Sequence, residues 1–218
     1  MVKIFSFCLY GRNPKYTLGM IENVKIINGK FNGWYIYIYY NNVPENIIEQ
    51  LQLYNNVVLI KSTYTNHKTM LDRFKPIDNV DVDIMMVRDA DSRIHDRDLW
   101  AINEFINSDK KLHIIRDHRC HQRPIMAGLF GMKRGFVDFN IENAIKIFER
   151  QNADAYQVDQ NFLEQFIYPI AIKTNDYLLH GNKIAENENS IPFLYPVVNR
   201  DFCGQVIDYK DNAEYRVF

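Results

Sequence analysis

Short runs of apolar residues alternate along this chain with longer segments in which apolar residues recur at helical spacing. The runs predict strands at residues 3–9, 34–40, 56–60, 82–87 and 112–116. The longer segments predict helices at residues 15–27, 44–53, 68–74, 97–107, 141–151 and 160–167. Asp96 is placed to cap the helix that starts at residue 97. This order is typical of an α/β sandwich whose first strands are parallel and are covered by helices.

One polar segment follows the apolar run of the fourth predicted strand without a break: MMVRDADSRIHDRD, residues 85–98. In open α/β sheets, ligands gather beyond the carboxyl ends of the strands. In an extended turn, Asp89 and Asp91 project the same way while Ala90 keeps clear of them. Two neighbouring carboxylates repel each other unless a cation lies between them, which favours a Mg²⁺ or Mn²⁺ site with free positions for phosphate oxygens. The alternative is a capped turn with surface ion pairs.

Length and composition narrow the class of protein. The 218 residues suit one well-filled core, so we expect a single domain over residues 1–218. With a net charge of -1, the protein has no overall electrostatic field that would attract nucleic acid. Any anion that it binds must be held by a local group of polar or basic residues. Three widely spaced cysteines, no signal peptide and no apolar run of membrane-spanning length predict a cytoplasmic protein without a membrane span. For a viral protein, this compartment would be the host cytoplasm.

Two longer stretches carry a family resemblance. TMLDRFKPIDNVDVDIMMVRDADSRIHDRD at 69–98 and HIIRDHRCHQRPIMAGLFGMKRG at 113–135 resemble the small GT-A glycosyltransferases of bacteria and large DNA viruses. The nearest similarity is to the N-terminal glycosyltransferase domain of a chlorella-virus protein. The resemblance implies the GT-A fold, a single mixed sheet flanked by helices. It also implies metal-dependent transfer of a sugar from a nucleotide diphosphate sugar, with UDP favoured, to a glycan or glycoprotein acceptor. Asp89 would then contact the ribose or the sugar, and both Asp89 and Asp91 would hold Mn²⁺ or Mg²⁺.

The resemblance extends to residues that would bind the donor. The nucleotide of GT-A enzymes lies against the end of the first strand, where Tyr10 would stack on or bond to the base. Gly11 belongs to the same strand end, and Arg12 would reach a phosphate. Arg73 matches the arginine of the family's RF element and would bind the donor. The alternatives are an ordinary loop after the first strand and a structural pairing of Arg73 with a neighbouring acid.

The basic segment RDHRCHQR, residues 116–123, follows the fifth predicted strand. The resemblance makes it the lip of the acceptor and donor-sugar pocket, with Asp117 and His118 as hydroxyl partners. The alternative is a solvated loop. Its histidines and cysteine are too close in sequence to close a zinc tetrahedron. Downstream, Gly128 and Gly131 fit either close approach to a ligand or close packing of a strand on the sheet.

Two later motifs complete the expected site. VDQNFL contains Asp159 and Gln160, which resemble the DQ element that retaining GT-A enzymes place near the anomeric carbon. The alternative for Asp159 is a helix N-cap. LLHGNK resembles in part the pattern in which His180 would be a third metal ligand and Lys183 a phosphate contact. The alternative for His180 is an exposed loop histidine. The surrounding polar residues, 180–193, predict a surface loop.

Other functions remain open at this stage. A neutral amide such as that of Gln160 is a poor general base, which favours retention of the anomeric configuration over inversion. Phosphatases of the haloacid dehalogenase type also place a DxD motif after a strand. A carbohydrate-binding protein with an inactive site would keep the fold alone.

Overall fold

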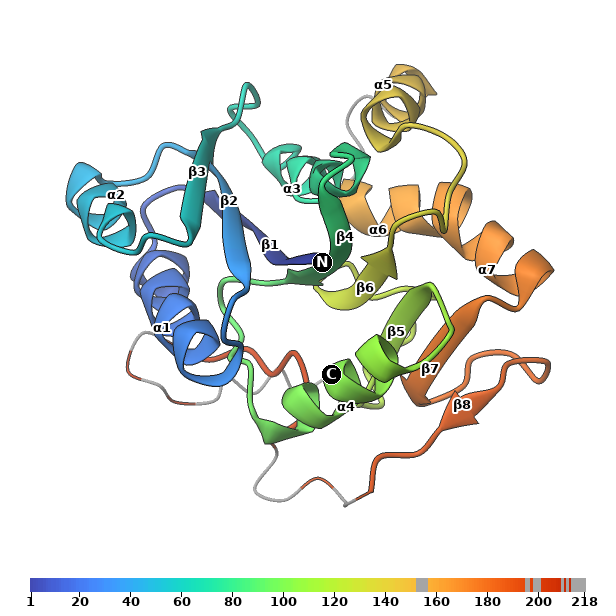
Figure 1. Ribbon diagram of the computed structural model, residues 1–218. Coiled ribbons are helices and arrows are strands. Elements are labelled where there is room, and N and C mark those ends of the chain that lie inside the picture. The colour runs from blue at the N-terminus through green and yellow to red at the C-terminus, as the bar shows by residue number, and fades with distance from the viewer. Residues whose placement is uncertain (152–156, 195–196, 198–200, 209, 211, 213–218) are drawn as a thin grey trace.

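The computed structural model describes residues 1–151, 157–194, 197, 201–208, 210 and 212. Eight strands form one sheet in the order β3-β2-β1-β4-β6-β5-β7-β8 (Figure 1). The strands are β1 Val2–Tyr10, β2 Tyr35–Asn41, β3 Val57–Lys61, β4 Val82–Arg88, β5 Leu112–Arg116, β6 Leu129–Lys133, β7 Tyr177–Gly181 and β8 Ser190–Ile191. The helices are α1 Pro14–Lys30, α2 Glu45–Gln52, α3 Thr69–Asp72, α4 Asp96–Asn107, α5 Ile141–Gln151, α6 Val158–Phe162 and α7 Tyr168–Thr174, with a 3₁₀ turn η1 at Lys75–Asp78 and a π turn η2 at Leu163–Ile167.

The sheet is mixed, as the family resemblance implies. Strands β3, β2, β1 and β4 are parallel, whereas β6 is antiparallel to both of its neighbours, β4 and β5. Strands β5, β7 and β8 are again parallel. The carboxyl ends of β1, β2, β3 and β4 therefore meet at one edge of the sheet, where the polar segment after β4 begins.

Helices cover both faces of the sheet (Figure 1). One apolar cluster joins α1, α2 and α4 to the sheet through residues such as Met20, Leu51 and Phe105. The other cluster packs α3, η1, α5, α6 and α7 on the opposite face. Buried apolar layers therefore cover both faces of the sheet. The loops at the carboxyl ends of β1 to β4 extend from this packed core.

Several local expectations need correction. The N-cap of α4 is His95, and Asp96 is the exposed first residue of the helix, paired with Lys30 at 2.5 Å. The helix expected at 68–74 is the short α3 followed by η1. The helix expected at 160–167 begins at Val158 in α6 and passes into the π turn η2.

The segment expected to be a polar surface loop contains buried structure. Its first residues belong to β7, and β8 lies near its end. Within it, Glu188 is 1% exposed and accepts hydrogen bonds from both terminal nitrogens of Arg116, at 2.8 and 2.7 Å. A buried guanidinium at the end of β5 therefore fastens this segment to the sheet.

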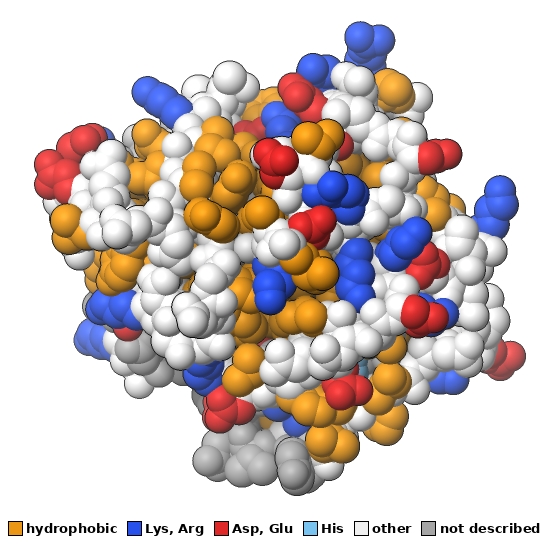
Figure 2. All heavy atoms as spheres, viewed as in Figure 1, with side chains coloured by type: hydrophobic (Ala, Val, Ile, Leu, Met, Phe, Trp, Pro, Cys, Tyr) orange, Lys and Arg blue, Asp and Glu red, His pale blue; other side chains and the backbone are white. Residues whose placement is uncertain are grey.

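Within the described residues, no helix has both the length and the apolarity that a membrane crossing requires. Lys and Arg side chains are interspersed with Asp and Glu side chains on the face shown in Figure 2. That distribution agrees with the small net charge of the sequence.

Candidate active site

The acidic turn after β4, residues 89–92, rests on helix α1. Asn23 is fully buried, and its side-chain amide donates to the carbonyl oxygens of Ser92 at 2.8 Å and Ala90 at 3.4 Å. A Cβ on Gly19, one turn earlier in α1, would lie 2.3 Å from the Ala90 carbonyl oxygen. The helix can approach the turn this closely only because Gly19 has no side chain. Ala90 itself is 3% exposed and faces the core.

A second support comes from residues 201–208, here called the C-terminal strap. The backbone N–H of Ile207 donates to the carbonyl oxygen of Asp91 at 2.8 Å, and Val206 forms an antiparallel bridge with Ser92. Gly204, at φ +79°, packs against Leu129 of β6. The turn that carries the two aspartates is therefore held between α1 and the strap.

Arg73 connects the acidic turn to the DQ motif. Its side chain is 3% exposed, one terminal nitrogen contacts Asp89 Oδ1, and the other donates to Asp159 Oδ2 at 2.8 Å. Burial opposes the charge on Arg73, but both carboxylates raise its pKa, so the guanidinium stays protonated. The structure therefore brings together three residues that the sequence proposed separately, and Arg73 makes the pairing with acids that was left open as an alternative.

The two aspartates of the turn differ in their surroundings. The side chain of Asp89 is 47% exposed, whereas that of Asp91 is 14% exposed. Burial and the neighbouring charge of Asp89 raise the pKa of Asp91 to about 6, and the nearby Lys15 opposes this rise. The Lys15 ammonium lies 3.6 Å from Asp91 Oδ2. A raised pKa in a carboxyl group beside another carboxylate indicates a place where additional positive charge would be favourable.

These residues fit a hard divalent cation. Carboxylate oxygens are the ligands that Mg²⁺ and Mn²⁺ prefer, and the mutual repulsion of Asp89 and Asp91 is what such an ion would relieve. The Asp89 carboxylate fits against Gly128, where a Cβ would lie 1.9 Å from Asp89 Oδ2. Gly128 thus provides room for a site side chain, while Gly131 packs on Met86 within the sheet.

The two arginines that flank the acidic turn, Arg88 and Arg93, have structural partners. Arg88 is 1% exposed, and its Nε and Nη2 donate to Asp98 Oδ1 at 3.1 and 2.9 Å. Arg93 donates to the carbonyl oxygens of Ala90 and Ser92, at 3.4 and 3.2 Å. Both guanidinium groups therefore brace the turn and the start of α4.

The DQ motif lies at the start of α6. Gln157, in the left-handed region, is the N-cap of this helix, so Asp159 is free of that role. Asp159 Oδ1 accepts the backbone N–H of Gln160 at 2.9 Å, while Oδ2 accepts from Arg73. The amide oxygen of Gln160 is buried without a hydrogen-bond partner among the described residues. A buried acceptor of this kind is suited to a ligand group.

A pocket of about 480 Å³ opens at the carboxyl ends of β1, β2 and β3. Its lining includes Tyr10, Tyr40, Asn41 and Thr65. The hydroxyl of Tyr10 donates to the carbonyl oxygen of Thr65 at 2.6 Å, which fixes the ring at the pocket wall. Gly11, at φ +83°, turns the chain away from β1, and the next residue, Arg12, is exposed.

The loop after β5 is tied to the C-terminal strap. Asp117 accepts from Arg97 Nε at 2.7 Å and from the backbone N–H of Cys203 at 3.0 Å. The ring of His118 stacks on Phe202, with centroids 4.1 Å apart. Desolvation and the nearby Arg119 lower the pKa of His118, so its ring is neutral at pH 7. This stacked pair forms an aromatic surface beside the strap.

The structure does not bring His180 to the acidic turn. His180 lies in β7, separated from β4 by β6 and β5, and it is fully buried. Its Nδ1 is 2.9 Å from Nε2 of His113, and its ring packs against Trp100. Lys183 is exposed in the loop that follows β7.

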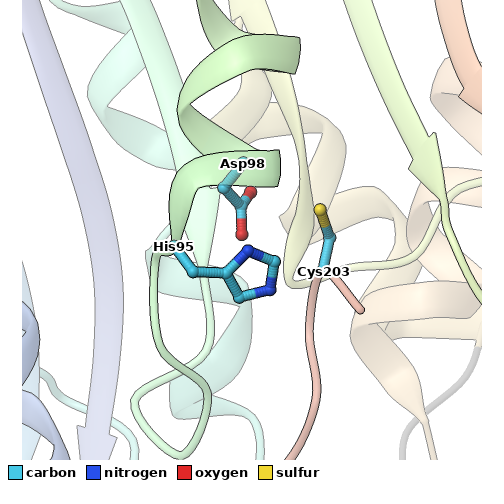
Figure 3. A group of neighbouring side chains, drawn as sticks. All are labelled: His95, Asp98 and Cys203. Atoms are coloured by element: carbon cyan, nitrogen blue, oxygen red, sulfur yellow. The ribbon is translucent and has the colours of Figure 1, made fainter. Parts of the chain in front are cut away.

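A separate group of potential metal ligands lies at the start of α4. One ligand atom each from His95, Asp98 and Cys203 lies within 4.8 Å of the others. Figure 3 shows the His95 ring beneath the Asp98 carboxylate, with the Cys203 thiol beside them. Because Asp98 already accepts two hydrogen bonds from Arg88, we interpret this group as a polar junction between α4 and the strap.

Sequence reasoning missed Lys15, Asn23 and Gly19, all on α1. The available signal was the loop GRNPK after the first predicted strand, in which Asn13 caps the helix and Pro14 starts it. That signal gives the start of α1, but it does not show which face of the helix meets the acidic turn.

Comparison with known proteins supports the fold. No family model and no curated protein matches the chain. Among solved structures, it is similar to the galactosyltransferase LgtC in complex with donor and acceptor sugar analogues, with a TM-score of 0.54 and 12% identity over 75% of this chain and 70% of that one. A glutamine-to-glutamate active-site mutant of LgtC gives a TM-score of 0.52 and 13% identity over 73% of this chain and 69% of that one. The glycosyltransferase GlyE of Streptococcus pneumoniae gives a TM-score of 0.55 and 14% identity over 82% of this chain, which spans 45% of GlyE. The fold is thus the GT-A fold that the family resemblance implies.

Proposed function

We propose that this protein is a metal-dependent glycosyltransferase that transfers a sugar from a nucleotide diphosphate sugar to a glycan or glycoprotein acceptor. The observation that carries the proposal is the joining of the acidic turn to the DQ motif by Arg73. Asp89 and Asp91 stand at one end of this arrangement, and Asp159 and Gln160 stand at the other. A nucleotide sugar needs such a pairing, because its diphosphate binds a cation and its sugar lies beyond the diphosphate.

The donor fits along the edge of the sheet. The pocket at the ends of β1, β2 and β3 suits a nucleoside, with the Tyr10 ring available beside the base. Arg12, exposed at the adjacent loop, suits a phosphate contact. UDP is the favoured nucleotide on the family resemblance alone. The fold is similar to that of LgtC, whose structure is in complex with donor and acceptor sugar analogues, and this similarity supports a nucleotide-sugar donor.

Asp89 and Asp91 would hold Mn²⁺ or Mg²⁺, which neutralises charge on the departing diphosphate. Arg73 acts as a positioning residue, because its contacts go to Asp89 and Asp159 rather than outward. It holds the carboxylate of Asp89 in place through this ion pair. Asp91, with a pKa raised to about 6, must lose its proton before it can ligate the ion.

We also propose that transfer retains the anomeric configuration. The buried amide oxygen of Gln160 is suited to stabilise positive charge that develops at the anomeric carbon. Asp159 is held by Arg73 and by the backbone of Gln160, which suits the orientation of sugar hydroxyls. The neighbour with an active-site glutamine-to-glutamate mutation shows that the active site of LgtC includes a glutamine.

A thermal-shift screen tests the proposal. UDP, GDP and CMP, each with and without Mn²⁺, are added to the wild-type protein and to Asp91→Asn. We expect a nucleoside diphosphate to raise the melting temperature of the wild type only with Mn²⁺, and to have no effect on Asp91→Asn. Equal stabilisation in EDTA would contradict the metal role. NMR of the anomeric proton in freshly formed product then distinguishes retention from inversion.

Two further measurements, phosphate release from a phosphomonoester and thermal shift with glycans, address the other functions. A haloacid dehalogenase-type phosphatase would use Asp89 as a nucleophile and would release phosphate from a phosphomonoester. A carbohydrate-binding protein would respond to glycans without a nucleotide. In this structure Asp89 is paired with Arg73, and a cationic partner lowers the nucleophilicity of a carboxylate, which favours the transferase.

A further inference from the structure

We propose that Lys15 is the internal counter-ion of Asp91 in the donor-free protein, and that it moves to the donor diphosphate when Asp91 binds a divalent cation. This inference rests on the proposed function, because it adds a residue to the same donor site. It concerns a lysine that neither the DxD motif nor the nucleoside pocket includes.

The position of Lys15 is unusual for a lysine. It is the second residue of α1, directly after the loop that leaves β1, and its side chain is only 13% exposed. Lysine side chains are seldom buried to this extent unless they are paired. On the same helix, Lys25 is 54% exposed and forms a surface pair with Glu22. The inward direction of Lys15 therefore reflects its partner, the carboxylate of Asp91.

The surroundings of Asp91 explain why its carboxylate needs this partner when no cation is bound. The side chain of Asp91 is 14% exposed, and Asp89 adds a second carboxylate to the same turn. The Lys15 ammonium, 3.6 Å from Oδ2 of Asp91, supplies positive charge beside these two acids. A divalent cation on Asp91 would perform the same task more strongly, and it would repel an ammonium group a few ångströms away. Lys15 and the cation are thus competitors for Asp91.

The contact between Lys15 and Asp91 is suited to release. The distance from Nζ to Oδ2 is 3.6 Å, longer than the 2.7–2.9 Å that is typical of a charge-assisted hydrogen bond. Tyr16 offers a nearby alternative, because the ammonium lies 5.1 Å from the centre of its ring. The side chain can therefore leave Asp91 without losing every favourable contact.

The released ammonium remains close to the diphosphate. A phosphate oxygen bound to the same cation as Asp91 would lie next to this carboxylate. The four-carbon side chain of Lys15 is long enough to reach it there. The positive end of α1, at which Lys15 stands, favours the same negative charge. One lysine would therefore weaken binding of the cation alone and strengthen binding of the cation together with the nucleotide.

This prediction of opposite signs can be tested without measuring activity. Mn²⁺ binding is followed from the electron paramagnetic resonance of free Mn²⁺, and UDP binding at saturating Mn²⁺ is followed by calorimetry. For Lys15→Met we expect Mn²⁺ alone to bind about three- to tenfold more tightly, since a competing ion pair is lost. We expect UDP to bind about tenfold more weakly, since a charge-assisted contact is lost. Lys25→Met on the same helix is the matched control and should resemble the wild type in both titrations.

A second pair of variants controls for loss of folding in Lys15→Met. Lys15→Gln should reproduce Lys15→Met, and Lys15→Arg should stay near the wild type because it keeps the charge. Unchanged or weaker Mn²⁺ binding in folded Lys15→Met or Lys15→Gln would overturn the counter-ion role. Unchanged UDP binding would overturn the transfer to the diphosphate. If wild-type protein binds Mn²⁺ but no nucleoside diphosphate, the proposed function fails, whereas the Mn²⁺ titration still decides the role of Lys15.

Discussion

Arg73 shows how much one buried guanidinium can organise. It holds the exposed Asp89 and the buried Asp159, which lies 86 residues away in the sequence. The sequence predicted each of the three residues for the site. It could not predict that they share one ion-pair network, because no local spacing relates residues so far apart. The packing of α3 against α6 brings Arg73 and Asp159 together.

The first prediction concerns this network. Arg73→Ala should lower the free energy of unfolding by about 3–5 kcal/mol, because it leaves a buried carboxylate at Asp159 without its partner. Asp159→Asn in the same chain should recover part of that loss, because it removes the unpaired charge. Urea titrations of the two single variants and the double variant measure the coupling. Strictly additive effects would show that the two side chains act independently.

The second prediction concerns protonation of Asp91. Because its pKa is raised to about 6, the ionised form is scarce below this pH and predominates above it. Protons compete with a metal for a carboxylate, so Mn²⁺ affinity should fall about tenfold per pH unit below pH 6 and level off above pH 7. Titrations between pH 5 and 8 by electron paramagnetic resonance check this. An affinity that is constant across this range would contradict it.

His180 illustrates the opposite outcome at the residue scale. In the sequence, this histidine is followed by a glycine and then by Lys183. The same pattern occurs in loops that bind a ligand and at the ends of strands. The structure pairs the ring of His180 with His113 beneath α4, away from the acidic turn. Burial of a ring depends on which strands flank it, and β7 itself was not predicted.

At the scale of elements, apolar runs located β1 to β5 correctly, with boundaries that differ by at most one residue. Strand β6 was not among the strands predicted from apolar runs, although close packing of a strand was one of the two interpretations of Gly131. The structure confirms that interpretation, because the missing side chain of Gly131 admits Met86 of the neighbouring β4. The local pattern of apolar residues therefore identifies a strand of bulky residues more readily than a strand that contains glycine for close packing.

Helix α1 gives the third prediction. Gly19→Ala should push the helix from the acidic turn, because the new Cβ would lie 2.3 Å from the Ala90 carbonyl oxygen. We expect lower stability and at least tenfold weaker Mn²⁺ binding, since displacement of the turn costs a metal–carboxylate contact. Gly29→Ala on the same helix has open space and is the matched control. It should stabilise the protein by up to about 1 kcal/mol through helix propensity. Identical behaviour of the two variants would refute the contact.

For the whole molecule, the resemblance predicted the GT-A fold, and similarity to solved transferases shows it. The attachment of the later residues to the sheet was less predictable. The polar composition of residues 180–193 suggested a surface loop, yet Glu188 inside it is buried in a salt bridge with Arg116. The sequence around Glu188 does not show that this carboxylate will pair with an arginine at the end of a distant strand.

The fourth prediction follows from that salt bridge. Burial alone would raise the pKa of Glu188, but hydrogen bonds from Arg116 and from the backbone of Ile184 outweigh it and lower the pKa to about 2. The unfolded value is near 4.5, so this group stabilises the fold fully above pH 4.5 and loses its contribution as the pH falls toward 2. The stability difference between wild type and Glu188→Gln, from denaturant titrations, should therefore shrink between pH 5 and 3. A constant difference would contradict this.

The C-terminal strap also affects how a new chain acquires its site during synthesis. Val206 and Ile207 reach Ser92 and Asp91 across more than a hundred residues, whereas β1 to β4 are complete early in the chain. Contacts between residues so far apart in sequence form late in folding, because the loop between them must close first. A ribosome-bound chain would thus carry the folded pocket at the ends of β1, β2 and β3 before the acidic turn is braced by the strap. The proposed cation site would then be completed after this pocket, once residues 201–208 have left the exit tunnel.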